Sequence, residues 1–299
     1  MAAATLIWVG AASSGRTRAQ VTGPIVATRL ADRYLLLTGA GCNVLMVTGP
    51  DGVLLVDGGT AERSPELLQA VAAQANGARV QALINTHWHV EHTGSNEALG
   101  RTGAAIIAHE NTKLWMGAEI AVKWQNRTYA PRPKEARPTR TFYGKETLTV
   151  GGERVELGHL GQAHTDGDIY AFFPGPNILM TGDVFSVGRY PILDYSTHGW
   201  IGGLSDASRT LLALTNAQTR VIPGTGPVQT QADLQAQADM VATMRTRLVE
   251  LMRKGMGVKD MLAAAPTKEF DARWGDPTLF ITNAYPGLWG HVRELGGIV

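Results

Sequence analysis

Short runs of apolar residues, separated by glycine-rich turns, dominate the first third of the chain. Three such runs predict strands at residues 34–38, 44–48 and 53–56, because aliphatic and β-branched residues bounded by Gly, Asn and Asp are typical of strands. The period then changes to a helical one, with Ser64 expected as the N-cap and Pro65 in the first turn. The sequence therefore predicts a helix that begins at Ser64, after the three strands.

The alternation of strands and helices continues beyond that helix. Residues 80–85 and 104–108 predict strands, and residues 93–99 between them predict a short helix. Strand–helix–strand order is typical of a parallel or mixed sheet covered by helices. We therefore expect an α/β fold.

A proline-rich segment at residues 129–140 predicts an exposed loop or lid, since strand patterns resume directly after it. The strands expected in this second half are 142–150, 154–160, 169–173 and 178–181. Helices are expected at 204–215 and about 231–254. The aromatic residues after Pro266 are expected to pack onto the body, namely Trp274, Phe280, Tyr285 and Trp289. No linker is evident, so residues 20–299 are interpreted as a single domain.

Composition narrows the class of protein. Hydrophobic residues make up 44% of the chain and charged residues 18%, which indicates a globular protein with a sizeable core. The formal net charge of +1 gives no electrostatic footprint for a nucleic acid partner. No apolar stretch reaches the ~18 residues of a membrane helix, so no integral membrane segment is expected.

The N-terminal segment leaves two interpretations open. Residues 2–12 resemble the apolar part of a secretory signal, and Thr17 and Ala19 fit the positions before a cleavage site. No Lys or Arg precedes the apolar run, however, so residues 1–19 are either a signal peptide or a disordered tail. The first interpretation places the protein in the periplasm or outside the cell, and the second in the cytoplasm.

The single cysteine, Cys42, limits the metal chemistry. One cysteine excludes an internal disulfide, a cysteine-based zinc ribbon and an iron–sulfur cluster. We interpret Cys42 as a small buried residue in a glycine-rich turn. Any metal site is therefore expected to use histidines and carboxylates.

Residues 85–92 hold the densest group of such side chains, His87, His89, Glu91 and His92. Histidines at positions i and i+2 of an extended segment or turn project to one side, where both can bind one ion. The group follows a predicted strand, and ligand sites in α/β sheets favour that end of a strand. Farther along, His164 lies in a turn and Asp183 ends a strand in Thr181-Gly182-Asp183.

In this order, these residues resemble the signature of the metallo-β-lactamase-fold hydrolase superfamily, over about residues 25–230. The resemblance implies a four-layer αβ/βα sandwich, in which two mixed sheets lie face to face with helices outside. The positions that match the signature are Asp57 in LLVDGG, the HxHxDH histidines His87, His89 and His92, His164 in AHTDGD, and Asp183 in TGDVF.

The resemblance implies a zinc site formed by His87, His89 and His164, with an open fourth position. A second site would use His92, Asp183 as a bridge, and Glu91. Asp57 is expected to orient a ligand histidine.

Two positions depart from the signature. Glu91 replaces the aspartate of HxHxDH, and Thr225 stands where the family has its last histidine. A hydroxyl is a far weaker zinc ligand than imidazole, so we expect one tight zinc and a weak or absent second ion. His198 could reach the vacated position or simply lie in a loop. Trp88 is either a core anchor or a wall of the substrate pocket.

The expected function is metal-dependent hydrolysis of a small-molecule ester, lactone, thioester, amide or phosphoester by a metal-bound hydroxide. Asp183 and Glu91 are the expected catalytic carboxylates, with Glu91 as a base or as a ligand. Asp183 argues against a dedicated β-lactamase, because two groups of family β-lactamases have Cys there and the third lacks the acidic bridge. The alternatives are a metal- or ligand-binding relative with little turnover, and a redox di-iron protein. The oligomeric state is not indicated by the sequence.

The signal-peptide interpretation predicts a shortened protein. If residues 1–19 are cleaved, protein purified from its native host begins near Gln20, and N-terminal sequencing of the exported fraction detects it. A cytosolic protein that begins at Met1 or Ala2 would contradict the signal.

Overall fold

Two large sheets organise the part of the chain that the computed structural model describes, residues 23–150 and 152–290. Within these residues, seven strands form the first sheet, in the order β1-β2-β3-β4-β5-β6-β9. Its strands are β1 (Val26–Ala31), β2 (Tyr34–Thr38), β3 (Val44–Gly49), β4 (Gly52–Val56), β5 (Val80–Ile84), β6 (Ala105–His109) and β9 (Arg140–Phe142). The candidate signal at residues 1–19 lies outside the described residues.

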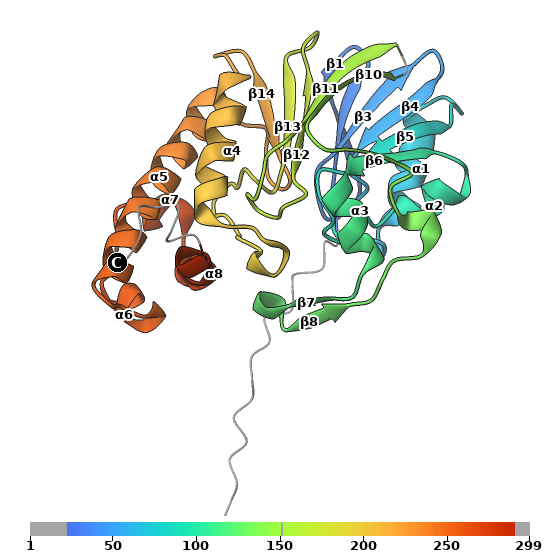
Figure 1. Cartoon of the computed structure of the whole chain (residues 1–299). Coiled ribbons are helices and arrows are strands. Elements are labelled where there is room, and N and C mark those ends of the chain that lie inside the picture. The colour runs from blue at the N-terminus through green and yellow to red at the C-terminus, as the bar shows by residue number, and fades with distance from the viewer. Residues whose placement is uncertain (1–22, 151, 291–299) are drawn as a thin grey trace, which may run out of the picture.

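The second sheet has the order β10-β11-β12-β13-β14. Its strands are β10 (Lys145–Val150), β11 (Glu153–His159), β12 (Ile169–Phe173), β13 (Ile178–Gly182) and β14 (Arg220–Pro223). A separate hairpin pairs β7 (Ile120–Val122) with β8 (Arg127–Tyr129) and projects below the sheets in Figure 1.

Strand residues of the first sheet are buried on both of its faces. Leu36 and Leu54 contribute to a core between the two sheets, which also contains Phe173 and Ile222 from the second sheet. Their neighbour Leu55 points the other way, into a core beneath the helices. Because successive side chains of a strand alternate between faces, burial on both faces explains the unbroken apolar runs in the sequence.

Helices cover the outer faces of both sheets (Figure 1). On the first sheet lie α1 (Ser64–Gln74), α2 (Asn96–Arg101) and α3 (Glu110–Gly117). On the second lie α4 (Ile201–Ala213), α5 (Gln231–Arg253) and, against them, α6 (Val258–Ala263), α7 (Asp271–Trp274) and α8 (Thr278–Gly290). Short 3-10 turns are η1 (Lys123–Gln125), η2 (Lys134–Ala136) and η3 (Tyr195–Thr197).

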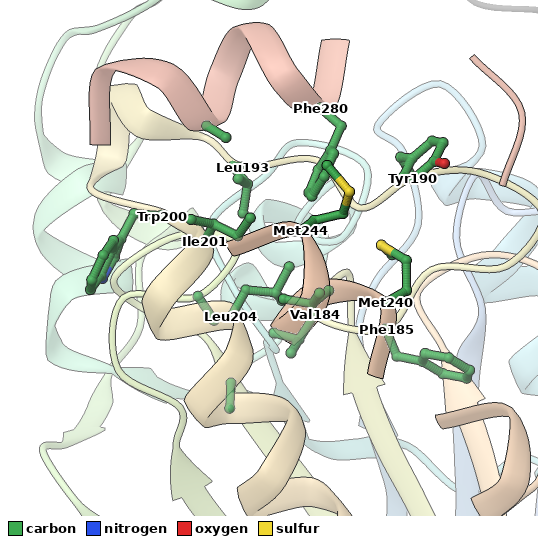
Figure 2. Packing of buried hydrophobic residues seen from close by; sticks show 14 of the residues in the cluster. Val184, Phe185, Tyr190, Leu193, Trp200, Ile201, Leu204, Met240, Met244 and Phe280 are labelled. Carbon is green, nitrogen blue, oxygen red and sulfur yellow. The ribbon is translucent and has the colours of Figure 1, made fainter. Parts of the chain in front are cut away.

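The helical core outside the second sheet is built from α4, α5 and α8. Figure 2 shows Ile201 and Leu204 of α4, Met244 of α5 and Phe280 of α8 directed toward one another. The order helix–sheet–sheet–helix is the predicted four-layer sandwich, which is thereby confirmed. Among the described residues, no helix combines the length and hydropathy needed to cross a bilayer.

Several element boundaries differ from the predictions. Arg63, not Ser64, is the N-cap of α1, because a turn at residues 61–63 leads directly into the helix and makes Ser64 its first residue. The predicted strand at 142–150 is two strands in different sheets, since the chain crosses between the sheets at Gly144. The predicted helix at 93–99 begins only at Asn96, after a turn.

Other parts of the chain also differ from the predictions. Trp274 and Phe280 are buried as expected, but Trp289 is 52% exposed. The hairpin β7–β8 and helix α3 were not predicted, because each is short. The segment 129–140 is exposed at most positions, as predicted for a loop. Within it, the carbonyl oxygen of Ala136 accepts a hydrogen bond from Asn96 Nδ2 of α2.

The core between the sheets predicts a large effect of truncating Phe173. This ring is fully buried and meets Tyr34 of the opposite sheet edge-on at 5.5 Å. Phe173→Ala is expected to lower the free energy of unfolding by about 3–5 kcal/mol, from lost burial and a residual cavity. Urea titration measures it, with the 73% exposed Tyr143 changed to Ala as control. Equal losses at both positions would contradict the assignment.

Candidate metal centre

Polar residues gather where the parallel strands of both sheets end. Asp57 follows β4 and His87 follows β5, which pairs in parallel with β4. In the second sheet, Asp183 follows β13, which pairs in parallel with β14. The carboxyl ends of parallel strands share one edge of a sheet, so the topology brings these side chains together.

Four of these side chains form the first group, which consists of His87, His89, His164 and Asp183. One ligand atom from each lies within 4.8 Å of the others, and all four residues are buried. Imidazole nitrogens and a carboxylate oxygen are the donors of catalytic zinc sites. The first group therefore has the composition and spacing of a metal site.

The outer nitrogens of the three histidines are occupied by hydrogen bonds. His89 Nε2 lies 2.9 Å from Asp194 Oδ2, and His164 Nδ1 lies 2.8 Å from the Ile192 carbonyl oxygen. Carboxylates and carbonyls accept, so both nitrogens carry a proton and donate.

The same reasoning applies to His87. The Thr86 hydroxyl lies 2.8 Å from Asp57 Oδ2 and 3.1 Å from His87 Nδ1. Since the hydroxyl has one proton and donates it to the carboxylate, it accepts from His87 Nδ1. The inner nitrogen, His87 Nε2, is buried and has no hydrogen-bond partner in the described structure.

The inner nitrogens of the three rings thus present lone pairs to the same point. His89 Nδ1 and His164 Nε2 lie only 3.0 Å apart. Two lone pairs at that distance repel unless a proton or a cation lies between them. Burial and the charge of His89 lower the pKa of His164 to about 4, whereas the hydrogen bond to Asp194 and the charges of Glu91 and Asp194 raise the pKa of His89 against the effect of burial. A proton on His89 Nδ1 relieves the repulsion in the metal-free protein, and a metal ion would take the place of that proton. A metal ion satisfies all three nitrogens at once.

The carboxylate of the first group is held ionised. Burial alone would raise the pKa of Asp183, but the charges of His92, His164 and His87 outweigh it and hold the pKa well below its usual range. A Cβ at Gly224 would lie 2.0 Å from Asp183 Oδ1. Only glycine therefore fits beside this carboxylate.

His92 belongs to a second group, which consists of Cys42, Asp57 and His92. Their ligand atoms also lie within 4.8 Å of one another, and all are buried. Asp57 Oδ2 accepts from His92 Nδ1 at 2.8 Å, and its other oxygen accepts from the Thr86 backbone N–H at 2.8 Å. Asp57 adopts φ +65° to do so. His92 Nε2 points toward the first group, 3.4 Å from Asp183 Oδ1.

A comparison with models of protein families shows to which family the chain belongs. The model of the metallo-beta-lactamase superfamily matches residues 37–239, which include every residue of both groups. The chain belongs to the metallo-β-lactamase superfamily. The resemblance inferred from the sequence is thereby confirmed.

Curated relatives match over part of their length. Similarity is 28% identity over 176 residues to 2,4-dinitroanisole O-demethylase subunit alpha of Nocardioides sp., covering 56% of this chain and 49% of the relative. The chain is also 29% identical over 177 residues to hydroxyacylglutathione hydrolase of Rhodospirillum rubrum, and this match covers 56% of this chain and 57% of the relative. The chain spans about half the length of these relatives.

Solved structures share the fold at low sequence identity. The metallo-beta-lactamase from Pontibacter korlensis has a TM-score of 0.60 and 21% identity, covering 73% of this chain and 99% of that one. The sec-alkylsulfatase Pisa1 from Pseudomonas sp. has a TM-score of 0.71 and 17% identity, covering 92% and 52%. These likenesses establish the sandwich of this superfamily.

Two predicted residues of the second metal site of the superfamily lie outside both groups. Glu91 is buried, and its charge helps to raise the pKa of His89 against the effect of burial, together with the hydrogen bond that His89 donates to Asp194. Its role as ligand or base stays a prediction. The Thr225 hydroxyl accepts a hydrogen bond from Arg189 at 3.1 Å.

His198 and Trp88 each have a hydrogen-bond partner outside the two groups. His198 Nδ1 lies 2.9 Å from Asp166 Oδ2, and its side chain is 58% exposed. Trp88 is buried in a cluster with Met116 and Tyr129, and its indole N–H donates to Thr197. This burial favours the core anchor over the pocket wall for Trp88.

Sequence reasoning missed Asp194, the partner of His89. The two residues are separated by 105 positions in the chain, and nothing in the local sequence around Asp194 distinguishes it from a loop aspartate. Asp168 holds the His164 turn: its carboxylate accepts from the backbone N–H of His164 at 2.6 Å and of Thr165 at 2.7 Å.

Removing a ring of the first group is expected to remove the metal. His87→Ala and His89→Ala should each lower zinc affinity by orders of magnitude. They should also abolish the stabilisation by zinc, about 2.7 kcal/mol at ~100 times the Kd. Elemental analysis and thermal unfolding with and without zinc measure both effects.

His198→Ala and His109→Ala are the matched controls, because both histidines lie outside the two groups. Their zinc content should equal that of the unmodified protein. The same loss in all four variants would contradict the first group as the metal site.

Proposed function

We propose that this protein is a zinc-dependent hydrolase of a small-molecule ester, lactone, thioester, amide or phosphoester. The observation that supports it is the pair of inner nitrogens, His89 Nδ1 and His164 Nε2, which lie 3.0 Å apart with their outer nitrogens already used. Such a pair fits a cation, and His87 Nε2, which has no hydrogen-bond partner in the described structure, belongs to the same group. His87, His89 and His164 would hold the zinc.

Zinc, when bound, makes a water nucleophilic at neutral pH and polarises the bond under attack. The chain supplies the surroundings. Asp194 and the Ile192 carbonyl fix the orientation of His89 and His164, and such partners also raise ligand basicity. Asp183 provides a negative charge beside the three rings. Glu91, buried near His89, is proposed as the base or as a further ligand.

The relatives suggest which bonds to test first. The name hydroxyacylglutathione hydrolase denotes thioester hydrolysis, and the name 2,4-dinitroanisole O-demethylase denotes cleavage at an aryl ether oxygen. In each case a polar bond to sulfur or oxygen is broken. We therefore choose a panel of six substrates: a hydroxyacylglutathione thioester, 2,4-dinitroanisole, an ester, a lactone, a lactam and a phosphodiester.

A binding protein with little turnover is the second candidate. It is favoured by Thr225, whose hydroxyl accepts from Arg189 and replaces the last histidine of the superfamily signature. Loss of that ligand is compatible with a site that binds but does not turn over. The proposed hydrolase requires only the first group, which is complete.

The proposal predicts hydrolysis that depends on the metal and on the first group. Protein purified without chelator should contain zinc and hydrolyse a member of the panel. Chelation should remove at least about 90% of the rate and zinc should restore it, because the nucleophile depends on the ion. His164→Ala should lower the rate as chelation does, and Asp194→Asn should weaken zinc binding by roughly 10–100-fold.

Two outcomes decide against the hydrolase. Zinc binding without hydrolysis of any member would favour the binding protein. Hydrolysis that survives complete removal of the metal would exclude the metal-dependent mechanism. His198→Ala serves as the control, because His198 lies outside both groups.

A further inference from the structure

The hairpin β7–β8 carries Trp124 to the edge of the first group. This hairpin lies between α3 and β9 in the chain, and Trp124 belongs to the 3-10 turn η1 at its tip. The ring centroids of Trp124 and His89 are 6.3 Å apart, and the ring planes are inclined by 46°. An aromatic side chain from a separate part of the chain therefore lies beside a histidine that is proposed to hold the zinc.

Packing fixes the base of the hairpin. Val122 and Tyr129, which are buried, belong to the same apolar cluster as Trp88, and Trp124 packs against this cluster. The ring of Trp88 meets the ring of Tyr129 edge-on at 5.5 Å and the ring of His89 edge-on at 4.5 Å. The place of Trp124 beside the first group is therefore set by packing rather than by a free loop.

The tip is attached less tightly than the base. In the described part of the chain, one hydrogen bond joins residues 123–126 to an element outside the hairpin, from the Lys123 backbone N–H to Ser196 Oγ at 3.2 Å. Lys123 and Asn126 are exposed, and Trp124 is half-buried. A surface segment with so few bonds to the body opens at low cost, so the tip is able to shift while the base stays in place.

The indole N–H of Trp124 is buried and has no hydrogen-bond partner in the described structure. The other two indoles in or against this cluster differ. Trp88 Nε1 donates to Thr197 Oγ1 at 3.2 Å, and Trp115 Nε1 donates to Asp166 Oδ1 at 2.6 Å. A buried donor without an acceptor is unfavourable, and such an exception in a folded protein calls for an explanation. The chain thus supplies an acceptor for each of these indoles except the one at the tip.

A ligand held at the metal centre is able to supply the missing acceptor. An indole N–H donates and does not accept, so its partner has to be an oxygen or another acceptor atom. The indole ring adds a large flat apolar surface next to that donor. The N–H is covered in the described structure, so the tip shifts when the ligand enters. The combination suits a flat apolar group that carries an oxygen.

We propose that Trp124 binds the substrate of this protein, with its ring against an aryl group and its N–H donating to an oxygen next to the bond that is cleaved. This inference rests on the proposed hydrolase function, because His89 beside Trp124 is a proposed zinc ligand. It narrows the substrate class to aryl compounds, such as aryl esters, in which an oxygen lies close to the ring. Alkyl substrates with the same bond leave the indole ring uncovered and bind more weakly.

Two substitutions separate the ring from the N–H. Trp124→Phe keeps an aromatic ring and removes the donor, so KM for the aryl form of the hydrolysed panel member should rise about twofold to tenfold, as for one lost hydrogen bond. The kcat should change by less than about twofold, because binding that is equal in the ground and transition states affects KM alone. Trp124→Leu also removes the ring and should raise KM for the aryl form at least about tenfold. For the methyl form of the same substrate, the two variants should have equal KM values.

Trp289→Phe is the matched control, since Trp289 is 52% exposed on α8 and lies outside the hairpin and both groups. Its KM values should equal those of the unmodified protein. Hydrolysis with an unchanged KM for the aryl form in both Trp124 variants overturns this inference and leaves the proposed hydrolase intact.

Nuclear magnetic resonance of the indole N–H tests the same bond in the unmodified, zinc-loaded chain, so misfolding of a variant does not decide the result. The signal that is missing from Trp124→Phe identifies Trp124 among the seven tryptophans. Benzoate, an aryl carboxylate that is not hydrolysed, should shift this signal downfield, and acetate at the same concentration should not.

The two measurements together separate this inference from the proposed function. A signal that benzoate leaves unchanged, in a protein that hydrolyses the panel member, contradicts binding at Trp124 alone. A benzoate shift without hydrolysis of any panel member supports binding at Trp124 and contradicts the hydrolase. A protein that shows neither the shift nor hydrolysis overturns both.

Discussion

The burial of several imidazoles and carboxylates at one point is the constraint on which the rest of this structure depends. His87, His89, His92 and His164 are almost completely buried, together with Asp57, Asp183 and Asp194. A buried polar group without a partner costs roughly 1–3 kcal/mol, and more when it is charged. Each outer nitrogen therefore has a dedicated acceptor, contributed by Thr86, Asp194, Ile192 or Asp57. The inner nitrogens of His87 and His92 have no hydrogen-bond partner in the described structure, and those of His89 and His164 face each other at 3.0 Å, which is why the arrangement suits a metal ion.

The sandwich provides the rigidity that this arrangement needs. The first sheet is packed on both faces, against the second sheet and against α1 and α2. The ends of β4, β5 and β13 are thus fixed relative to one another. The loops that deliver Asp194 and His164 are tied down by Asp168 and by the packing of Trp200 and Leu193 against α8. A site built on such elements keeps its geometry better than one built on free loops.

Departures from the superfamily signature are concentrated on one side of the centre. The first group retains all of its expected donors, whereas Glu91 and Thr225 alter the neighbouring position. Cys42 lies on that altered side, next to His92 and Asp57. The changes are therefore coupled in space although they are separated in sequence.

The sequence by itself determined the fold class and most of the first group. Apolar runs, glycine turns and the spacing of His87, His89 and His92 are local, and local periodicity states which side chains share a side. Other decisions required the tertiary structure. Asp194 lies 105 positions from the ring that it orients, and His164 lies 75 positions from the nitrogen that it faces. Cys42 gave no local signal beyond burial, and His198 was a candidate for the vacated position that only its bond to Asp166 places in the described structure. Such pairings depend on strand order and direction, which bring distant loops to one edge and cannot be read from residue spacing.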